Sequence, residues 1–155
     1  MAFQLSSTAF GAGQSIPARY TCTGQDISPP LNWGDPPQGT RSLALIVDDP
    51  DAPAGTWVHW VIYNLPATSR ALYEAVSPKQ TELPDGSRQG RNSGQRTGYM
   101  GPCPPSGTHR YFFKLYALDT VLDLPAGATK DQLLNAAQGH ILAQAELMGI
   151  YAKQK

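Results

Sequence analysis

The sequence carries little charge, and its positive and negative charges balance. Only 15% of its 155 residues are charged, with twelve basic and twelve acidic side chains, so the formal net charge is zero. No basic run or stripe appears, which argues against nucleic acid and anionic membrane surfaces as partners. No apolar run is long enough to cross a bilayer, so we expect no transmembrane segment.

Targeting signals and cysteines are equally scarce. The first seven residues hold no charged segment followed by an apolar run, so no secretory signal is expected and a cytoplasmic location is the default. Cys22 and Cys103 are the two cysteines, and their spacing fits no zinc motif. A cytoplasmic compartment favours two reduced thiols. The alternative is that the two residues meet in space beside the candidate site.

Turn-forming residues, by contrast, are abundant. Fifteen glycines and fourteen prolines, with 41% hydrophobic residues, predict one globular domain over residues 1–155, built from short strands and many turns. Alternating or continuous apolar patterns predict strands at 3–10, 18–22, 31–33, 42–47, 57–65 and 110–118. Thr129 and Gln132 fit a capping box that starts a helix ending near Gly139. The segment 145–151 fits either a last strand or more helix.

One acidic stretch stands out between the two clearest strands. Asp49-Pro50-Asp51-Ala52-Pro53 follows a buried apolar run, and its prolines stiffen the turn. The next strand begins Trp57-Val58-His59-Trp60. Side chains alternate along a strand, so Trp57 and His59 should share one face, and Val58 and Trp60 the other. We also consider Ala52–Pro53 a candidate cis peptide bond.

A second stretch combines a loop rich in glycine and proline with a histidine and a tyrosine. Residues 84–108 lack periodicity and contain six glycines and four prolines, which is typical of a binding loop. The loop ends in Gly101-Pro102-Cys103-Pro104-Pro105-Ser106-Gly107-Thr108-His109-Arg110-Tyr111. His109 and Tyr111 share a strand face, whereas Arg110 points the other way and should pair with an acid.

Together the two stretches resemble the phosphatidylethanolamine-binding protein family, in particular its small bacterial and archaeal Raf-kinase-inhibitor-like branch. The likeness spans nearly the whole chain, from Ser28-Pro29-Pro30-Leu31 to Gly149-Ile150-Tyr151. It implies a mainly β fold of two packed antiparallel sheets with Greek-key connections and a short helix near the C-terminus. It also implies that residues 145–151 form a strand.

The resemblance further implies a small anion pocket at one end of the sheets. Its ligand-binding residues would be Asp49, Asp51, Trp57, His59, Gly101, Pro104, Pro105, His109 and Tyr111. The expected ligand is phosphate or a phosphorylated head group, bound without a cofactor. A kinase or a serine protease is the expected type of protein partner, and a homodimer is left open.

Two other functions use the same residues. A small hydrolase could use Ser106 or Cys103 as its nucleophile with His109 as base, but neither lies on a Gly-x-Ser-x-Gly elbow. A metal-assisted enzyme could use the aspartates and histidines, but no His-x-x-x-His spacing is present. We therefore expect a binding protein with neither catalytic nor metal-ligating residues. A structural protein with a vestigial pocket is the third alternative.

Carboxylates repel phosphate, so the aspartates need an indirect role. Asp49 and Asp51 could each raise the pKa of a neighbouring histidine and keep His59 or His109 protonated as a donor to the anion. Asp51 could also accept backbone N–H bonds and fix the loop. This hypothesis predicts tighter anion binding as the pH falls toward about 6.

Overall fold

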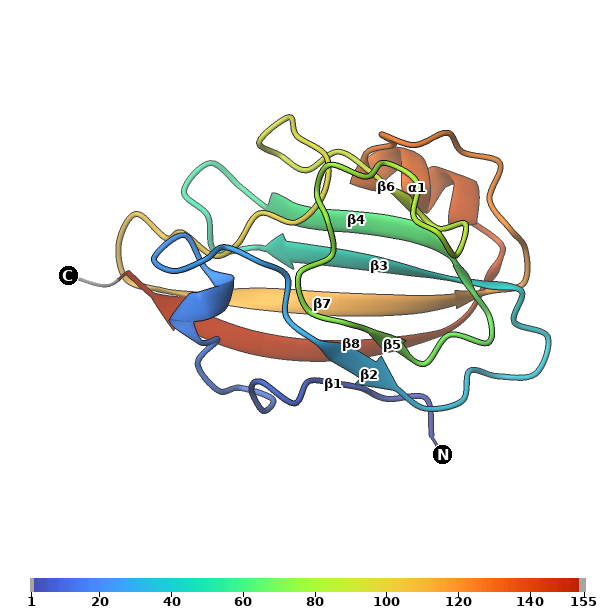
Figure 1. Ribbon diagram of the computed structural model, residues 1–155, viewed down its shortest axis with the longest axis horizontal. Helices are drawn as coiled ribbons and strands as arrows, with labels where there is room; N and C mark the ends of the chain where they lie inside the picture. Colours follow the sequence, from blue (N-terminus) through green and yellow to red (C-terminus); the bar gives the residue numbers. More distant parts are fainter. Residues whose placement is uncertain (1, 154–155) are drawn as a thin grey trace.

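The computed structural model describes residues 2–153, which form two antiparallel sheets and one short α-helix (Figure 1). The larger sheet has the strand order β6-β4-β3-β7-β8 and the smaller has the order β1-β2-β5. In the larger sheet the strands are β3 (Ser42–Asp49), β4 (Trp57–Pro66), β6 (Arg88–Gln89), β7 (Thr108–Leu118) and β8 (Ile141–Ala152). The smaller sheet consists of β1 (Leu5–Ser6), β2 (Leu31–Trp33) and β5 (Ala71–Leu72).

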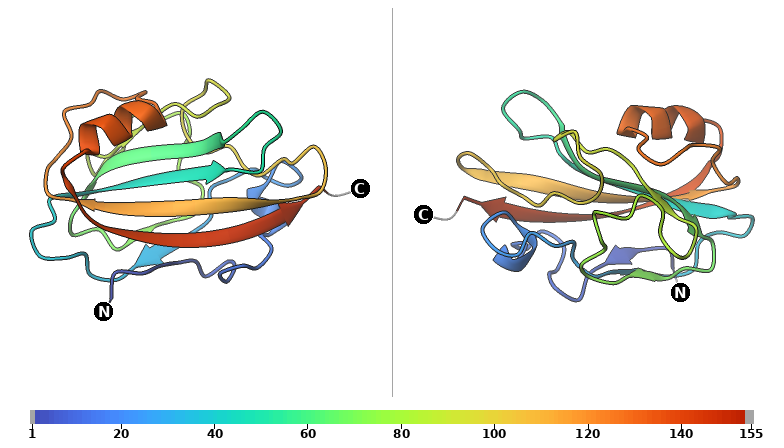
Figure 2. Two further views of the ribbon diagram at one scale, coloured as in Figure 1. Left: turned by 180° about the vertical axis from the view of Figure 1, so that it is seen from behind. Right: turned by 45° about the horizontal axis from the view of Figure 1, so that its top comes forward.

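The continuous apolar run of β3 reflects burial on both faces of the larger sheet. Leu43, Leu45 and Val47 belong to the core between the two sheets, whereas Ala44 and Ile46 pack on the side of the helix. Figure 2 shows this layering, with the helix on one face of the larger sheet and the small sheet on the other. A strand covered on both faces has no position for an exposed polar residue, so its sequence does not alternate.

The helix α1 (Lys130–Ala137) begins where its cap predicts. The Thr129 side chain accepts a hydrogen bond from the Gln132 backbone N–H, and the Gln132 side chain accepts one from the Thr129 N–H. Leu133 and Ala137 are buried against the larger sheet. In the part of the chain that the structure describes, this eight-residue helix is the longest, and none is a candidate for crossing a membrane.

Three local predictions are settled by the structure. Residues 145–151 lie within β8, so the strand interpretation is confirmed. The predicted strand at 18–22 is wrong: Ala18–Tyr20 form a 3₁₀ helix, because the Tyr20 and Thr21 N–H groups donate to carbonyls three residues earlier, those of Pro17 and Ala18. The cis bond proposed for Ala52–Pro53 is also wrong, since residues 2–153 contain no cis peptide bond.

Candidate functional site

Strand order brings the two sequence motifs to the same end of the larger sheet. β3 pairs antiparallel with both β4 and β7, so its C-terminal end lies beside the first residues of both neighbours. Asp49 ends β3, His59 is the third residue of β4, and His109 is the second of β7. The acidic turn and the proline-rich loop therefore meet, although some fifty residues separate them in sequence.

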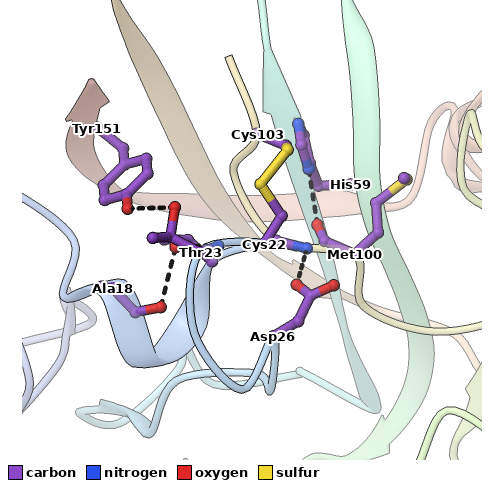
Figure 3. The surroundings of a disulfide bond; sticks show 10 residues. Ala18, Cys22, Thr23, Asp26, His59, Met100, Cys103 and Tyr151 are labelled. Atoms are coloured by element: carbon purple, nitrogen blue, oxygen red, sulfur yellow. Dashed lines mark hydrogen bonds between the residues drawn. A yellow bond between two sulfur atoms is a disulfide. The ribbon is translucent and has the colours of Figure 1, made fainter. Parts of the chain in front are cut away.

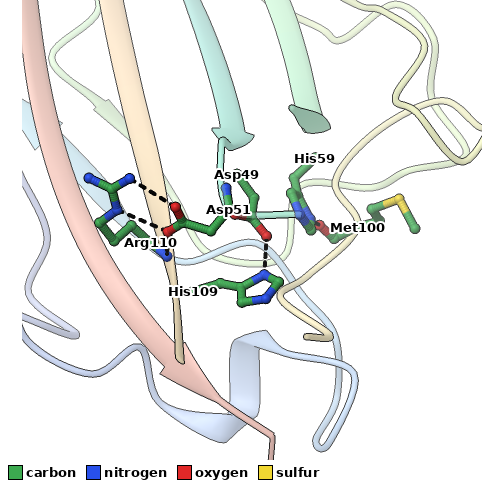
Figure 4. A network of polar contacts seen from close by, with 6 residues as sticks. All are labelled: Asp49, Asp51, His59, Met100, His109 and Arg110. Carbon is green, nitrogen blue, oxygen red and sulfur yellow. Dashed lines mark hydrogen bonds and ion pairs between the residues drawn. The ribbon is translucent and has the colours of Figure 1, made fainter. Parts of the chain in front are cut away.

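The acidic turn is held by its own first carboxylate. Asp49 Oδ1 accepts the backbone N–H of Asp51 at 2.8 Å, and its Oδ2 lies 2.6 Å from His109 Nδ1 (Figure 4). An ionised carboxylate only accepts hydrogen bonds, so Nδ1 of His109 carries the proton in this pair. Both side chains are almost completely buried. The nitrogen of His109 that remains for a ligand is therefore Nε2.

A β-bulge sets the direction of the His59 side chain. On β3, Val47 pairs with Trp60 and Asp48 pairs with Val58, which leaves His59 as the extra residue between two pairings. The prediction that Val58 and Trp60 share a face is therefore wrong: Val58 packs on the helix side, and Trp60 lies in the core between the sheets. Bulges of this kind redirect a side chain at a binding site.

His59 is fastened to Met100 at both its backbone and its ring. The Met100 N–H donates to the His59 carbonyl at 2.9 Å, and His59 Nδ1 donates to the Met100 carbonyl at 2.6 Å. Burial lowers the pKa of His59 below its ordinary value, and this effect exceeds the opposing effects of the Met100 hydrogen bond and the Asp49 charge. The expectation that an aspartate keeps His59 protonated is therefore wrong. At neutral pH its Nε2 is an acceptor.

The proline-rich loop packs closely against the turn that follows the 3₁₀ helix. The Gly101 N–H donates to Asp26 Oδ1 at 2.7 Å, and a Cβ at Gly101 would come within 2.4 Å of the Tyr20 carbonyl oxygen. No side chain fits in that space, which explains the glycine. The expectation of reduced thiols is wrong here, because Cys22 and Cys103 are joined by a disulfide (Figure 3).

A cavity of about 270 Å³ lies between the acidic turn, β4, the proline-rich loop and β7. Eight of the nine predicted binding residues line it: Asp49, Trp57, His59, Gly101, Pro104, Pro105, His109 and Tyr111. Four further residues line it that the sequence did not single out as binding residues, namely Ala52, Pro53, Met100 and Cys103. Three of these lie inside the two motifs, and the fourth, Met100, directly precedes the second motif. Their position within or next to a motif is therefore the one feature of the sequence that could have identified them as lining residues.

Asp51, the ninth predicted residue, does not line the cavity. Its carboxylate accepts two side-chain hydrogen bonds from Arg110, at 2.8 and 2.9 Å, and one from the Arg110 backbone N–H at 2.9 Å. Hydrogen bonds from the Arg110 side chain and backbone lower the pKa of Asp51 to about 2. The predictions that Arg110 pairs with an acid and that Asp51 accepts a backbone N–H are confirmed. Asp51 thus fastens the acidic turn to β7.

Tyr111 contributes the one conspicuous unpaired group. Its side chain is 1% exposed and lines the cavity between the two histidine rings, whose centroids lie 5.2 Å (His59) and 6.4 Å (His109) from its own. Among the residues described, its hydroxyl is the only buried side-chain polar atom without a hydrogen-bond partner. Burial, followed by the charges of Asp49 and Asp51, raises the pKa of the phenol far above its ordinary value. It therefore stays protonated and can act as a donor.

The cavity combines a polar floor with apolar walls. We call Asp49, both histidines and Tyr111 the floor of the cavity, and the prolines, Met100 and Trp57 its walls. Trp57 is 37% exposed and its indole N–H points to the Met100 sulfur at 3.4 Å. Within residues 2–153, no group of three or more His, Cys, Asp or Glu side chains is arranged to hold a metal ion.

Comparisons with known proteins agree with this architecture. The sequence model described as phosphatidylethanolamine-binding protein matches residues 6–152. A UPF0098 protein of Methanothermobacter thermautotrophicus is 56% identical over 149 residues, covering 96% of this chain and 98% of its own length. A UPF0098 protein of Chlamydia muridarum is 49% identical, covering 96% of this chain and 97% of its own.

Solved structures give the same result. A putative phosphatidylethanolamine-binding protein homologue from Chlamydia trachomatis superposes with a TM-score of 0.90 at 47% identity, covering 99% of both chains. YbcL of E. coli, described as a new member of the mammalian family, superposes with a TM-score of 0.91 at 33% identity, covering 99% of this chain and 100% of its own. The chain described here belongs to the phosphatidylethanolamine-binding protein family.

Proposed function

We propose that the cavity binds a small anion, namely phosphate or the phosphoryl group of a phosphorylated head group. The observation that carries the proposal is the buried, unpartnered hydroxyl of Tyr111, a residue that lines the cavity. A buried donor without an acceptor costs about 1–3 kcal/mol, and an anionic oxygen would remove that cost. The family membership supports a small-ligand-binding protein in general terms.

The two histidines divide the hydrogen bonding in this proposal. Neutral His59 presents an Nε2 acceptor, because its Nδ1–H is used by the Met100 carbonyl. A phosphate that retains one proton can donate its P–O–H to this nitrogen. His109, with Nδ1 on Asp49, donates through Nε2 when it is protonated. A phosphoryl group loses its second proton with a pKa of roughly 6, so the monoprotonated ligand prevails below that pH.

The negative charge of Asp49 does not oppose this arrangement directly. One of its oxygens accepts the Asp51 N–H and the other accepts from His109, so both face protein donors. The Asp51 charge is offset by Arg110 outside the cavity. An anion in the cavity therefore meets the donors that the carboxylates position.

Binding rather than turnover is the proposed activity, and its output is modulation of a partner. The resemblance to Raf-kinase-inhibitor-like proteins favours a kinase or a serine protease. The half-exposed Trp57 at the opening offers an apolar contact close to the ligand. Through such a contact, occupancy of the cavity could alter the affinity for the partner.

The test is a calorimetric titration with inorganic phosphate of protein purified without phosphate. We expect saturable binding at pH 6, weakened at least tenfold in His109→Ala through loss of a charged hydrogen bond. The matched control is His140→Ala. His140 also pairs with an aspartate, Asp119 at 2.7 Å, but beyond the opposite end of β7.

Two results would reject the proposal. One is no saturation at millimolar phosphate, and the other is equal affinity in the His109→Ala and His140→Ala variants. Hydrolysis of p-nitrophenyl phosphate that is lost in His109→Ala would instead assign the cavity to an enzyme.

A further inference from the structure

The wall of the cavity is attached to the rest of the protein by a covalent bond that solvent can reach. Cys103 lines the cavity, and its disulfide joins it to Cys22 in the turn after the 3₁₀ helix, with 5.4 Å between the two Cα atoms. Both cysteines are exposed. Exchange with a thiolate requires access to a sulfur atom, and exposed disulfides are the readily reduced ones.

Besides the disulfide, three hydrogen bonds between described residues join this loop to the 3₁₀ helix and the turn after it, one of them from the Tyr99 hydroxyl to the Tyr20 carbonyl at 2.7 Å. The Cys22 N–H donates to the Pro102 carbonyl at 3.1 Å, and the Gly101 N–H donates to Asp26 Oδ1 at 2.7 Å. Residues 100–107 belong to no helix or strand, so no ladder of hydrogen bonds fixes them. The disulfide is therefore the strongest link between the proline-rich loop and the turn.

The floor of the cavity is built differently. His59 and His109 lie on β4 and β7, whose pairings with β3 include neither cysteine. Tyr111 lies on β7 as well and pairs with Gly149 of β8. Met100, where the wall begins, is itself fixed to His59 by two hydrogen bonds. Breaking the disulfide should therefore free residues 102–107 and leave the floor groups in their places.

We propose that the Cys22–Cys103 disulfide is a redox switch for the cavity, a proposal that rests on the proposed anion binding. In the oxidised protein the wall is pre-organised around the ligand. A dithiol reductant transfers two electrons and two protons: the S–S bond breaks, two S–H groups form, and the dithiol becomes a disulfide. The freed loop must then be ordered again on binding, which lowers affinity by roughly five- to tenfold.

The experiment compares the whole chain before and after treatment with dithiothreitol, with thiols counted by Ellman's reagent under denaturing conditions. Phosphate affinity is measured by calorimetry, and amide hydrogen exchange is followed at Cys22, Gly101 and the β3 strand. We expect affinity to fall five- to tenfold on reduction. Exchange at Cys22 and Gly101 should rise at least tenfold, and β3 should stay protected, although the loss of global stability speeds its exchange as well.

Cys22→Ser is the matched variant, because it removes the bond but keeps Cys103 in the wall. It should bind phosphate like the reduced protein and should not respond to dithiothreitol. This variant separates the effect of the bond from any effect of the reductant.

The outcomes distinguish this proposal from the proposed function. If neither form binds phosphate, the proposed function fails, and the exchange at Cys22 and Gly101 still decides whether the disulfide controls the wall. Equal exchange in both forms, tighter binding after reduction, or two free thiols before reduction would overturn the switch. Complete loss of β3 protection on reduction would also overturn it, since the whole fold, and not the wall alone, would then depend on the bond.

Discussion

Replacing Tyr111 by phenylalanine should move stability and ligand affinity in opposite directions. The substitution removes only the hydroxyl, which is buried and has no partner. A buried hydroxyl without a hydrogen bond costs about 1–3 kcal/mol, so its removal should leave the ligand-free protein as stable or about 1 kcal/mol more stable. For a chain of this size, 1 kcal/mol corresponds to roughly 2–4 °C in melting temperature.

The same change should weaken phosphate binding. A hydrogen bond to a charged group contributes about 1.5–3 kcal/mol, so its loss corresponds to a roughly 10- to 150-fold weaker affinity. Urea unfolding in phosphate-free buffer measures the stability, and calorimetric titration with phosphate measures the affinity. Both are needed, because a gain in stability alone would not show that the hydroxyl contacts the ligand.

Tyr63→Phe is the matched control. The Tyr63 hydroxyl donates to the Pro125 carbonyl and accepts the Ala128 N–H, and the residue packs on the helix side of the larger sheet, away from the cavity. Its loss should cost about 1–3 kcal/mol of stability and leave phosphate affinity unchanged. A Tyr111→Phe protein that loses stability while keeping its full affinity for phosphate would refute the assignment of the hydroxyl to the ligand.

Three further predictions concern pH and the disulfide. Because burial lowers the pKa of His59, its stabilising contribution is complete above the unfolded value of about 6.5 and is lost as the pH falls through the lower folded value. Urea unfolding from pH 7.5 to 5 should therefore depend less on pH in His59→Gln than in the parent, and equal slopes would contradict this. The pKa of Asp51 is lowered to about 2, so its contribution persists above about 3.9 and disappears as the pH falls through 2. Acid unfolding of Asp51→Asn should show a smaller loss of stability between pH 4 and 2 than the parent, although solvent around Arg110 keeps the difference small. Finally, the Cys22→Ser/Cys103→Ser double variant should lose roughly 4 kcal/mol, since the bond closes a segment of 81 residues, and a melting temperature within 2 °C of the parent's would contradict this expectation.

Local sequence patterns predicted the elements that are long enough to show a period. β3, β4, β7 and α1 each extend over at least eight residues, so their apolar spacing was visible. The strand predicted at 3–10 proves to be only the two residues of β1, and the two-residue strands β5 and β6 are not predicted, because no period can be recognised over that length. These short strands form because other segments of the same chain lie beside them and supply hydrogen bonds. The sequence of one short segment does not show which segments will lie beside it.

The direction of His59 could not be predicted for a related reason. Alternation assumes an unbroken ladder, but the bulge depends on how β4 pairs with β3. One extra residue in β4 shifts the alternation of side chains between the two faces of the sheet, so Val58 and Trp60 lie on different faces. The lowered pKa of His59 cannot be predicted from the sequence either, because the sequence shows nearby acids but not the depth at which the ring is buried.

The cysteine pair illustrates the limit of a compartment argument. The prediction of reduced thiols rests on the expected cytoplasmic location, because disulfides are uncommon in that compartment. Contact between residues 81 apart depends on the whole fold. Gly101 was the nearest local sign, since only a residue without a side chain allows the loop to approach the Tyr20 carbonyl.

The site divides into two parts that respond to different perturbations. Because β3 is antiparallel to both neighbours, its last residue must lie beside the first residues of β4 and β7, and that topology alone assembles Asp49, His59 and His109. The walls come from loops instead, held by Arg110 on one side and by the disulfide on the other. Substitutions in the floor should therefore change which ligand the cavity binds and how binding depends on pH. Reduction of the disulfide should instead change the affinity for the same ligand, because it loosens the wall around it.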